Sequence, residues 1–500
     1  MLALLGGVTL WIWGDRLTLA GEGERAAGLE IRVRGAEPVS SPEYQVVLET
    51  MRSQLNADPG VASVEAGPMG RDGRTTSLRA VLSGDASERD ATVDRLQDGL
   101  DPGPLKISFA GQAGDLDDAR EGAAHDLRLL ALGLPLVLLL AAYLGPPLFA
   151  AAVLASAAAI GVAAAVAVAA AGLLDSPVMA LTGIGAIGLV LPLELFLLLR
   201  AGVPRRAVSG GALVAALAFA ALAVLGVGYV RSIALGGAIA AVLAAPAAIA
   251  ASTGFGQTEP TTGRGTLQGL LRNLAAAIRW SRPVAAGIAA LAVLTLLLVA
   301  VPATRLETVS LTSPFAPAIS AVELGACAAI AVLGGALVAA MLSRSPALSL
   351  ALALTAVLPA AAATGTVVLV FEDGRLETLL DYNSSGGLSL GALATAVAAL
   401  VAIGLARGTA LLVALRRRRG ESAEDRLLDA ISATGAAAAL VSGVGAALAI
   451  ALLGSGHDFL KQFGATMSVG LLLDLIAVRA LIAPALLRVA GTGTAANVGQ

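Results

Sequence analysis

GIGAIGLVLPLELFLLLR, residues 183–200, decides between two very different folds for this chain. Gly183, Gly185 and Gly188 have the spacing G-x-G-x-x-G, which holds a dinucleotide pyrophosphate when it follows a strand and opens a helix. Here the glycines lie inside an apolar run, and no strand-like segment comes before them. The sequence therefore predicts a membrane-spanning helix, in which small residues let neighbouring helices approach closely.

The composition around this stretch is that of a polytopic membrane protein. The mean hydropathy is +0.83 and 14% of the residues are charged, compared with about a quarter in soluble domains. A helix needs about 20 predominantly apolar residues to cross a bilayer. Such runs lie at 127–144, 148–172, 178–200, 210–230, 232–253, 283–303, 320–342, 347–371, 389–415, 430–453 and 459–487, with a shorter one at the N-terminus. We expect a packed α-helical bundle of about 12 helices.

Arginines gather in alternate loops between these runs. The clusters are Arg200, Arg205 and Arg206; Arg264, Arg272, Arg279 and Arg282; Arg344; and residues 416–419 with Arg426. The positive-inside rule places these loops in the cytoplasm. By parity, the hydrophilic segment 15–126 lies on the other side of the membrane.

The segment 15–126 has the pattern of a compact α+β domain. Strand patterns occur at 29–35, 61–67, 75–84 and 105–111, and helical spacing occurs at 41–55 and 86–100. The order β-α-β-β-α-β is that of ferredoxin-like domains. We expect one such domain outside the membrane.

The chain also repeats itself. GLVLPLELFLLLR (188–200) and GLARGTALLVALR (404–416) align without gaps, and each ends a span at cytoplasmic arginines. Two more spans and an Ala-Pro-Ala sequence, at Pro246 and Pro484, follow each copy. The simplest account is two tandem units of six helices.

The N-terminal apolar segment is shorter than a full span, and neither a basic region nor a clear cleavage site marks it as a signal peptide. We expect a truncated or misassigned start, which the upstream coding sequence would test. The predicted organisation is a truncated first span (1–14), an extracytoplasmic α+β domain (15–126), five spans (127–253), a cytoplasmic linker (254–282), a seventh span (283–303), a vestigial second extracytoplasmic loop (304–319), five spans (320–490) and a cytoplasmic tail (491–500).

This layout resembles the resistance-nodulation-division (RND) transporters, and within them it is most similar to the MMPL (mycobacterial membrane protein large) lipid exporters. HDFLKQFGATMSVGLLLDLIAVRALIAPALLRVAG, residues 457–491, is similar to the last two helices of that family. The family landmarks fall on Gly470, Asp474, Arg479 and Pro484–Leu487. The exported segment, which contains DPGVASVEAGP, resembles the first porter domain of the family.

The resemblance implies a transporter that uses the proton gradient to move lipids or other amphiphiles out of the inner membrane. The family couples through an Asp-Tyr pair in the fourth helix and another in the tenth. Aligned on the arginine at the helix end, these positions are Pro192–Leu193 and Gly408–Thr409 in this chain, so both pairs are missing. Asp381–Tyr382 has the same letters but precedes the tenth span, in an exported loop.

Two charged residues lie inside the helices that lack these pairs. Glu194 is six residues, about 9 Å of helix, from Arg200, and Arg407 adjoins the missing acid of the tenth span. A charge near mid-membrane costs roughly 3 kcal/mol, so it persists where it is paired, hydrated or used. One hypothesis is a Glu194–Arg407 ion pair in place of the proton site.

The alternative is that both side chains snorkel to the inner interface. Helix geometry favours this alternative, because Glu194 is about 200° round the helix from the position of the family's acid. Pro192 could reset that phase by breaking the helical hydrogen bonds.

Asp474 and Arg479 are further intramembrane charges, in the last span. They either pair with each other for helix packing or take part in transport. Glu323 is expected at the outer interface, and His457 and Asp458 in a short outer loop.

The leading hypothesis is an MMPL/RND-like transporter that exports lipids or hydrophobic molecules across a bacterial plasma membrane. The alternative is a transport-inactive RND-fold scaffold or accessory subunit, favoured by the loss of the second exported domain. A sterol-sensing-like lipid receptor shares the fold and has no specific residue in its favour. Besides lipids or hydrophobic small molecules, the expected partners are a second copy of the chain or cell-envelope proteins.

Several classes of function find no support in the sequence. A net charge of −3 gives no indication of nucleic-acid binding. Cys327 is the single cysteine, so neither an internal disulfide nor a cysteine metal site is expected. We expect no enzyme activity, metal or cofactor, because no catalytic triad, phosphate-binding loop or zinc motif is present.

Overall fold

The computed structural model describes residues 28–110, 146–254, 306–307, 321–372, 388–417, 423–455 and 458–487, except for short gaps at 68, 70–72, 85, 171–173, 175–176 and 226–227. The spans predicted at 1–14, 127–144 and 283–303, the linker, the tail, Asp381–Tyr382 and His457 lie outside these residues.

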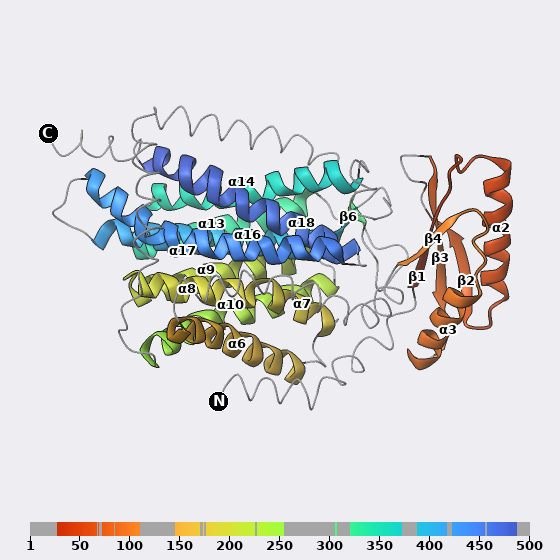
Figure 1. Ribbon diagram of the computed structural model, residues 1–500, viewed down its shortest axis with the longest axis horizontal. Helices are drawn as coiled ribbons and strands as arrows, with labels where there is room; N and C mark the ends of the chain where they lie inside the picture. The colour runs from red at the N-terminus through yellow and green to blue at the C-terminus, as the bar shows by residue number, and fades with distance from the viewer. Residues whose placement is uncertain are drawn as a thin grey trace.

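The N-terminal part of the chain folds as an α+β domain, shown in red and orange in Figure 1. Its elements are β1 (Gly28–Arg34), α2 (Pro42–Ala57), β2 (Val61–Ala66), β3 (Thr75–Leu82), α3 (Ala86–Gly99) and β4 (Lys106–Ala110). The strands form one antiparallel sheet in the order β2-β3-β1-β4. This element order and strand order are those of the predicted ferredoxin-like fold.

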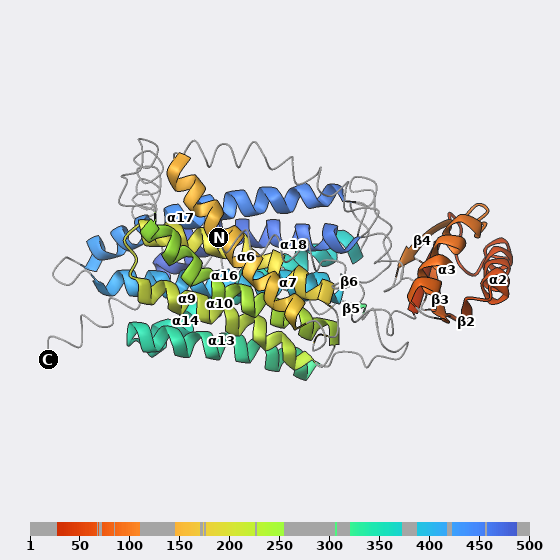
Figure 2. The ribbon, with the colours of Figure 1, turned by 90° about the horizontal axis from the view of Figure 1, so that it is seen from below.

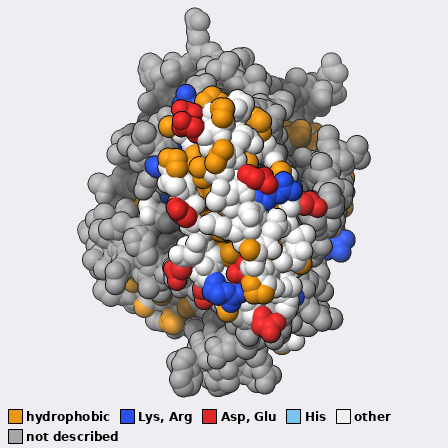
Figure 3. Space-filling view, turned by 90° about the vertical axis from the view of Figure 1, so that its right-hand side faces the viewer, with side chains coloured by type: hydrophobic (Ala, Val, Ile, Leu, Met, Phe, Trp, Pro, Cys, Tyr) orange, Lys and Arg blue, Asp and Glu red, His pale blue; other side chains and the backbone are white. Residues whose placement is uncertain are grey.

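The core of this domain lies between the sheet and its two helices. Alternate residues of β1, namely Leu29, Ile31 and Val33, are buried, as period-2 strands require. Tyr44 of α2 is also buried, and its hydroxyl donates to the carbonyl of Val33 at 2.7 Å. On the described part of the face in Figure 3, acidic and basic side chains are mixed with apolar ones, without a large patch of one sign.

The rest of the described chain is a helical bundle (Figures 1 and 2). Its first helices are α6 (Pro146–Ala169), α7 (Pro177–Gly188), α8 (Val190–Arg200), α9 (Arg205–Ala221), which η2 (Leu222–Leu225) extends, and α10 (Gly228–Gly254). The later ones are α13 (Ala321–Ser343), α14 (Pro346–Val367), η4 (Val368–Glu372), α16 (Leu390–Arg417), α17 (Ala423–Ala451), η5 (Leu452–Gly454), α18 (Asp458–Leu473) and η6 (Asp474–Ile482). Within the described residues, nine spans are long and apolar enough to cross a membrane. Each corresponds to one of the predicted runs, and α7 and α8 together form one span.

The helices of the two halves pack in matching ways. In the first half α10 packs against α6, α7 and α9, and in the second half α18 packs against α14, α16 and α17. Between the halves, α9 lies against α16 and α8 lies against α17. The same pairs recur at the same places in each half, which supports the tandem repeat seen in the sequence.

Small residues allow the helices of the bundle to approach closely. A side chain at Gly183 of α7 would collide with the backbone carbonyl of Ile233 in α10, and one at Gly236 of α10 would collide with the carbonyl of Ala180. The glycines of the opening motif therefore serve helix packing, and the nucleotide-loop interpretation is excluded because Gly183–Gly188 is helical.

The outer face of α13 is apolar and exposed. Ile330, Leu333, Leu337 and Met341 follow helical spacing and are 45–74% exposed. In a membrane-spanning helix such a stripe contacts lipid.

The arginine-bearing turns lie at one end of the bundle. α8 ends at Arg200 and α9 begins at Arg205. Gly210 of α9 lies against Leu342, two residues before Arg344, so these turns are neighbours. Figure 1 shows α7 on the side of the α+β domain and α8 leading away from it. In Figure 1 the arginine-bearing end of the bundle lies away from the α+β domain.

On the domain side, β5 (Leu306–Glu307) pairs in parallel with β6 (Leu388–Ser389). This pairing joins the segment before α13 to the residues immediately before α16.

Candidate functional site: a buried charge network

Glu194 lies on α8, just after an interruption of the helix. α7 ends at Gly188 and α8 begins at Val190, and Leu189 between them keeps right-handed helical angles. Pro192 has no backbone N–H, so it cannot donate the helical hydrogen bond to the carbonyl of Gly188. The hydroxyl of Ser156 on α6 donates to the carbonyl of Leu189 at 3.1 Å, which satisfies a backbone group at the break. Beyond it, the Glu194 side chain is fully buried.

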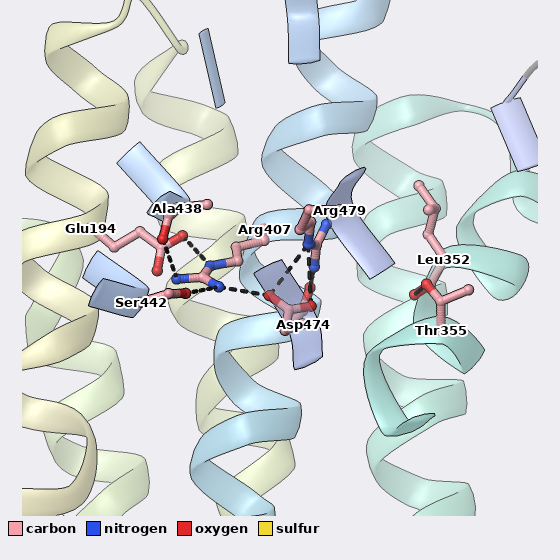
Figure 4. A network of polar contacts seen from close by, with 9 residues as sticks. Glu194, Leu352, Thr355, Arg407, Ala438, Ser442, Asp474 and Arg479 are labelled. Atoms are coloured by element: carbon pink, nitrogen blue, oxygen red, sulfur yellow. Dashed lines mark hydrogen bonds and ion pairs between the residues drawn. The ribbon is translucent and has the colours of Figure 1, made fainter. Parts of the chain in front are cut away.

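Arg407 of α16 is the centre of the network (Figure 4). Its Nε donates to Glu194 Oε1 at 2.6 Å, and its Nη1 donates to Asp474 Oδ2 at 2.6 Å and to the hydroxyl of Ser442 at 2.9 Å. Its Nη2 donates to the carbonyl of Ala438 at 3.3 Å. Arg407 is 3% exposed, so one guanidinium links α8, α16, α17 and η6 inside the bundle.

Asp474 and Arg479 meet because the last span changes its helical type. Asp474 is the first residue of η6, which is a π-helix. Residues five apart are about 140° apart round an α-helix, whereas a π-helix bonds residue i to i+5 and brings them to the same side. Arg479 Nε lies 3.3 Å from Asp474 Oδ1, and its Nη2 donates to the carbonyl of Gly404 at 2.7 Å.

The four charges balance. Two guanidinium groups and two carboxylates sum to zero, which is the arrangement that makes ionised groups tolerable away from water. One atom is left over: Glu194 Oε2 is buried without a hydrogen-bond partner among the described residues. A buried carboxylate oxygen without a donor is costly.

The predicted Glu194–Arg407 ion pair is present, and so is the Asp474–Arg479 pair. Snorkelling is wrong for Glu194 and Arg407, because both side chains are buried in the bundle. The helical-phase argument against the pair is wrong, because Arg407 Nε donates to Glu194 Oε1 at 2.6 Å although Leu189 keeps right-handed helical angles.

The positions of the missing Asp-Tyr pairs contribute no charge to the network. Pro192 and Leu193 are buried in α8, and the hydroxyl of Thr409 donates to the carbonyl of Leu405 in its own helix. A Cβ at Gly408 would make only ordinary contact with Leu352.

One residue of the network was not predicted from the sequence, and the side chains of two predicted residues lie outside the part of the chain that the structure describes. Ser442 was missed, because a single hydroxyl in an alanine-rich span gives no signal of its partner. Glu323 lies in α13 and Asp458 at the start of α18, with their side chains outside the described set. Cys327 is half-buried in α13, and the described residues hold no group of acids, histidines or cysteines able to bind a metal ion.

Spanning helices in two similarly packed halves, an α+β domain at one end and charges between the halves define a multi-pass helical membrane protein. The fold is similar to that of SecDF. SecDF from Thermus thermophilus, a translocon-associated membrane protein, is 15% identical with a TM-score of 0.50, and the match covers 98% of both chains. SecDF in its super-membrane-facing form is 16% identical with a TM-score of 0.47, and the match covers 95% of this chain and 85% of that one. No protein-family model and no curated protein sequence matches the chain.

Proposed function

We propose that this protein is an RND-type transporter of lipids or other hydrophobic molecules, in which the charge network replaces the missing Asp-Tyr relay. The observation that carries the proposal is the Glu194–Arg407–Asp474–Arg479 network, which lies at the junction of the two halves. Glu194 belongs to the first half and the other three residues belong to the second. A proton taken up at Glu194 would neutralise the ionic link between the halves and so bias their relative position.

The class of substrate follows from the resemblance of residues 457–491 to the MMPL exporters. The charge pattern supports a plasma-membrane location, with the arginine-bearing turns in the cytoplasm and the α+β domain outside, where it would act as a porter domain. Membrane lipids would then surround the bundle and would also be the candidate substrates nearest to it.

The test is flux in proteoliposomes that contain the full-length protein, with and without an imposed pH gradient. The probes are a fluorescent phospholipid and a lipophilic dye. We expect gradient-dependent flux in the wild type and a loss of roughly tenfold or more in Glu194→Gln, because the amide cannot exchange the proton. Glu49→Gln, which changes a 75% exposed carboxylate on α2, is the matched control and should leave the flux unchanged.

A second candidate is a transport-inactive scaffold that binds lipids or an envelope protein. The neutrality of the network favours it, because four mutually paired charges also make a stable structural tie. Probe binding without flux at any pH gradient would establish this candidate. Equal flux in the wild type and in Glu194→Gln would reject the proton-coupled transporter.

A further inference from the structure

The two buried carboxylates of the network are held in different ways. Asp474 faces two guanidinium groups: Arg407 donates to Oδ2 at 2.6 Å, and Arg479 Nε lies 3.3 Å and 3.4 Å from Oδ1 and Oδ2. Glu194 faces one guanidinium through Oε1, and its Oε2 has no donor among the described residues. Both oxygens of Asp474 are therefore bonded to positive groups, whereas Glu194 keeps one oxygen available for a proton.

The backbone of η6 fixes Arg479 in its place. The π-helical register sets Arg479 on the same side of the helix as Asp474, five residues earlier. Arg479 Nε faces Asp474, and Nη2 of the same guanidinium donates a hydrogen bond to the carbonyl of Gly404, which fixes its orientation. An α-helical register in this span would turn Arg479 away from Asp474 by about 140° and leave the carboxylate with Arg407 alone.

Few other ionisable groups face the network from the described helices. α6, α7 and the stretch of α14 from Pro346 to Val367 carry none, and α17 carries none between Ala430 and Ala451. The others lie towards helix ends: Arg200 on α8, Arg205 and Arg206 on α9, Tyr229 and Arg231 on α10, Glu323 and Cys327 on α13, Arg416 and Arg417 on α16, Glu424, Asp425, Arg426 and Asp429 on α17, and Asp458 and Lys461 on α18. The charge state of each carboxylate is thus set mainly by Arg407 and Arg479.

We propose that Arg479, placed by the π-helix, is a positioning residue that keeps Asp474 ionised, so that Glu194 is the one carboxyl of the network that exchanges a proton. This inference rests on the proposed function, because it assigns the proton of that function to a single site. Proton uptake at Glu194 leaves Arg407 bound to Asp474, Ser442 and Ala438, and the network then carries one positive charge. Release restores neutrality.

The test is infrared difference spectroscopy of the full-length protein in lipid nanodiscs, recorded between acidic and alkaline pH in the carbonyl region of protonated carboxyl groups. We expect one buried carboxyl band in the wild type, which disappears in Glu194→Gln. In Arg479→Gln the two carboxylates share one guanidinium, so we expect both to titrate and the band to grow about twofold. Arg479→Lys keeps the positive charge and should restore the single band.

Two further variants separate this effect from loss of fold. Arg479→Gln combined with Asp474→Asn removes one charge of each sign and should return to the single band of Glu194. Glu49→Gln should match the wild type. A single band in Arg479→Gln, unchanged from the wild type, would overturn the role of Arg479 and leave proton exchange at Glu194 intact. A wild-type protein without any buried carboxyl band would overturn proton exchange itself, and with it both proposals.

Discussion

Arg407→Leu is expected to lower the free energy of unfolding by about 3–5 kcal/mol, because it leaves Glu194 buried without a counter-charge. Glu194 is fully buried and Arg407 supplies its one hydrogen bond among the described residues. Asp474 retains Arg479. The measurement is denaturation of the purified protein in mixed detergent micelles. Arg231→Leu, which removes an exposed arginine of α10, is the control and should change the stability little.

The double variant Arg407→Leu with Glu194→Leu tests whether the unpaired charge of Glu194 causes the loss of stability. It removes the pair together and leaves Asp474 with Arg479, so most of the lost stability should return. If the double variant is as unstable as Arg407→Leu alone, the loss comes from packing at these positions and the electrostatic explanation is rejected.

Gly183→Ala is expected to destabilise the bundle by about 3 kcal/mol, at the upper end of the range for overpacked cores. The added Cβ would meet the backbone carbonyl of Ile233 and the backbone of Gly237, which cannot rotate away as a side chain can. α7 and α10 would have to separate along their contact. Thermal unfolding in detergent measures the effect.

Gly185 provides the matched control two residues along the same helix. A Cβ at Gly185 meets nothing within 4 Å, so Gly185→Ala should be neutral or stabilising by up to about 1 kcal/mol through helix propensity. Equal stabilities of Gly183→Ala and Gly185→Ala would show that α7 and α10 do not pack through Gly183.

The fold could be predicted from the sequence because its signals are local. Long apolar runs place the spans, and period-2 and helical patterns give the element order of the α+β domain. The charged residues of the site could also be identified, because an ionisable group in an apolar run is conspicuous.

The geometry of the site could not be predicted in the same way. The contact of Glu194 with Arg407 depends on how the two halves of the bundle pack together, and the meeting of Asp474 with Arg479 depends on a π-helix that regular helical spacing does not reveal. The roles of Ser442 and the carbonyl of Ala438 depend on how α17 packs. Such contacts come from tertiary structure, where a few degrees of helix rotation change the partners.

The alanine-rich core has a consequence for how this chain can change over generations. Alanine is the commonest residue of the bundle's largest buried cluster, so its side chains have little volume left to lose. Substitutions that shrink a residue are therefore rarely available, and those that enlarge one force helices apart. Neutral substitutions in this protein should gather on the lipid-facing stripe of α13, where Leu, Ile, Val and Met are interchangeable, while the buried alanine positions accept little beyond Gly and Ser.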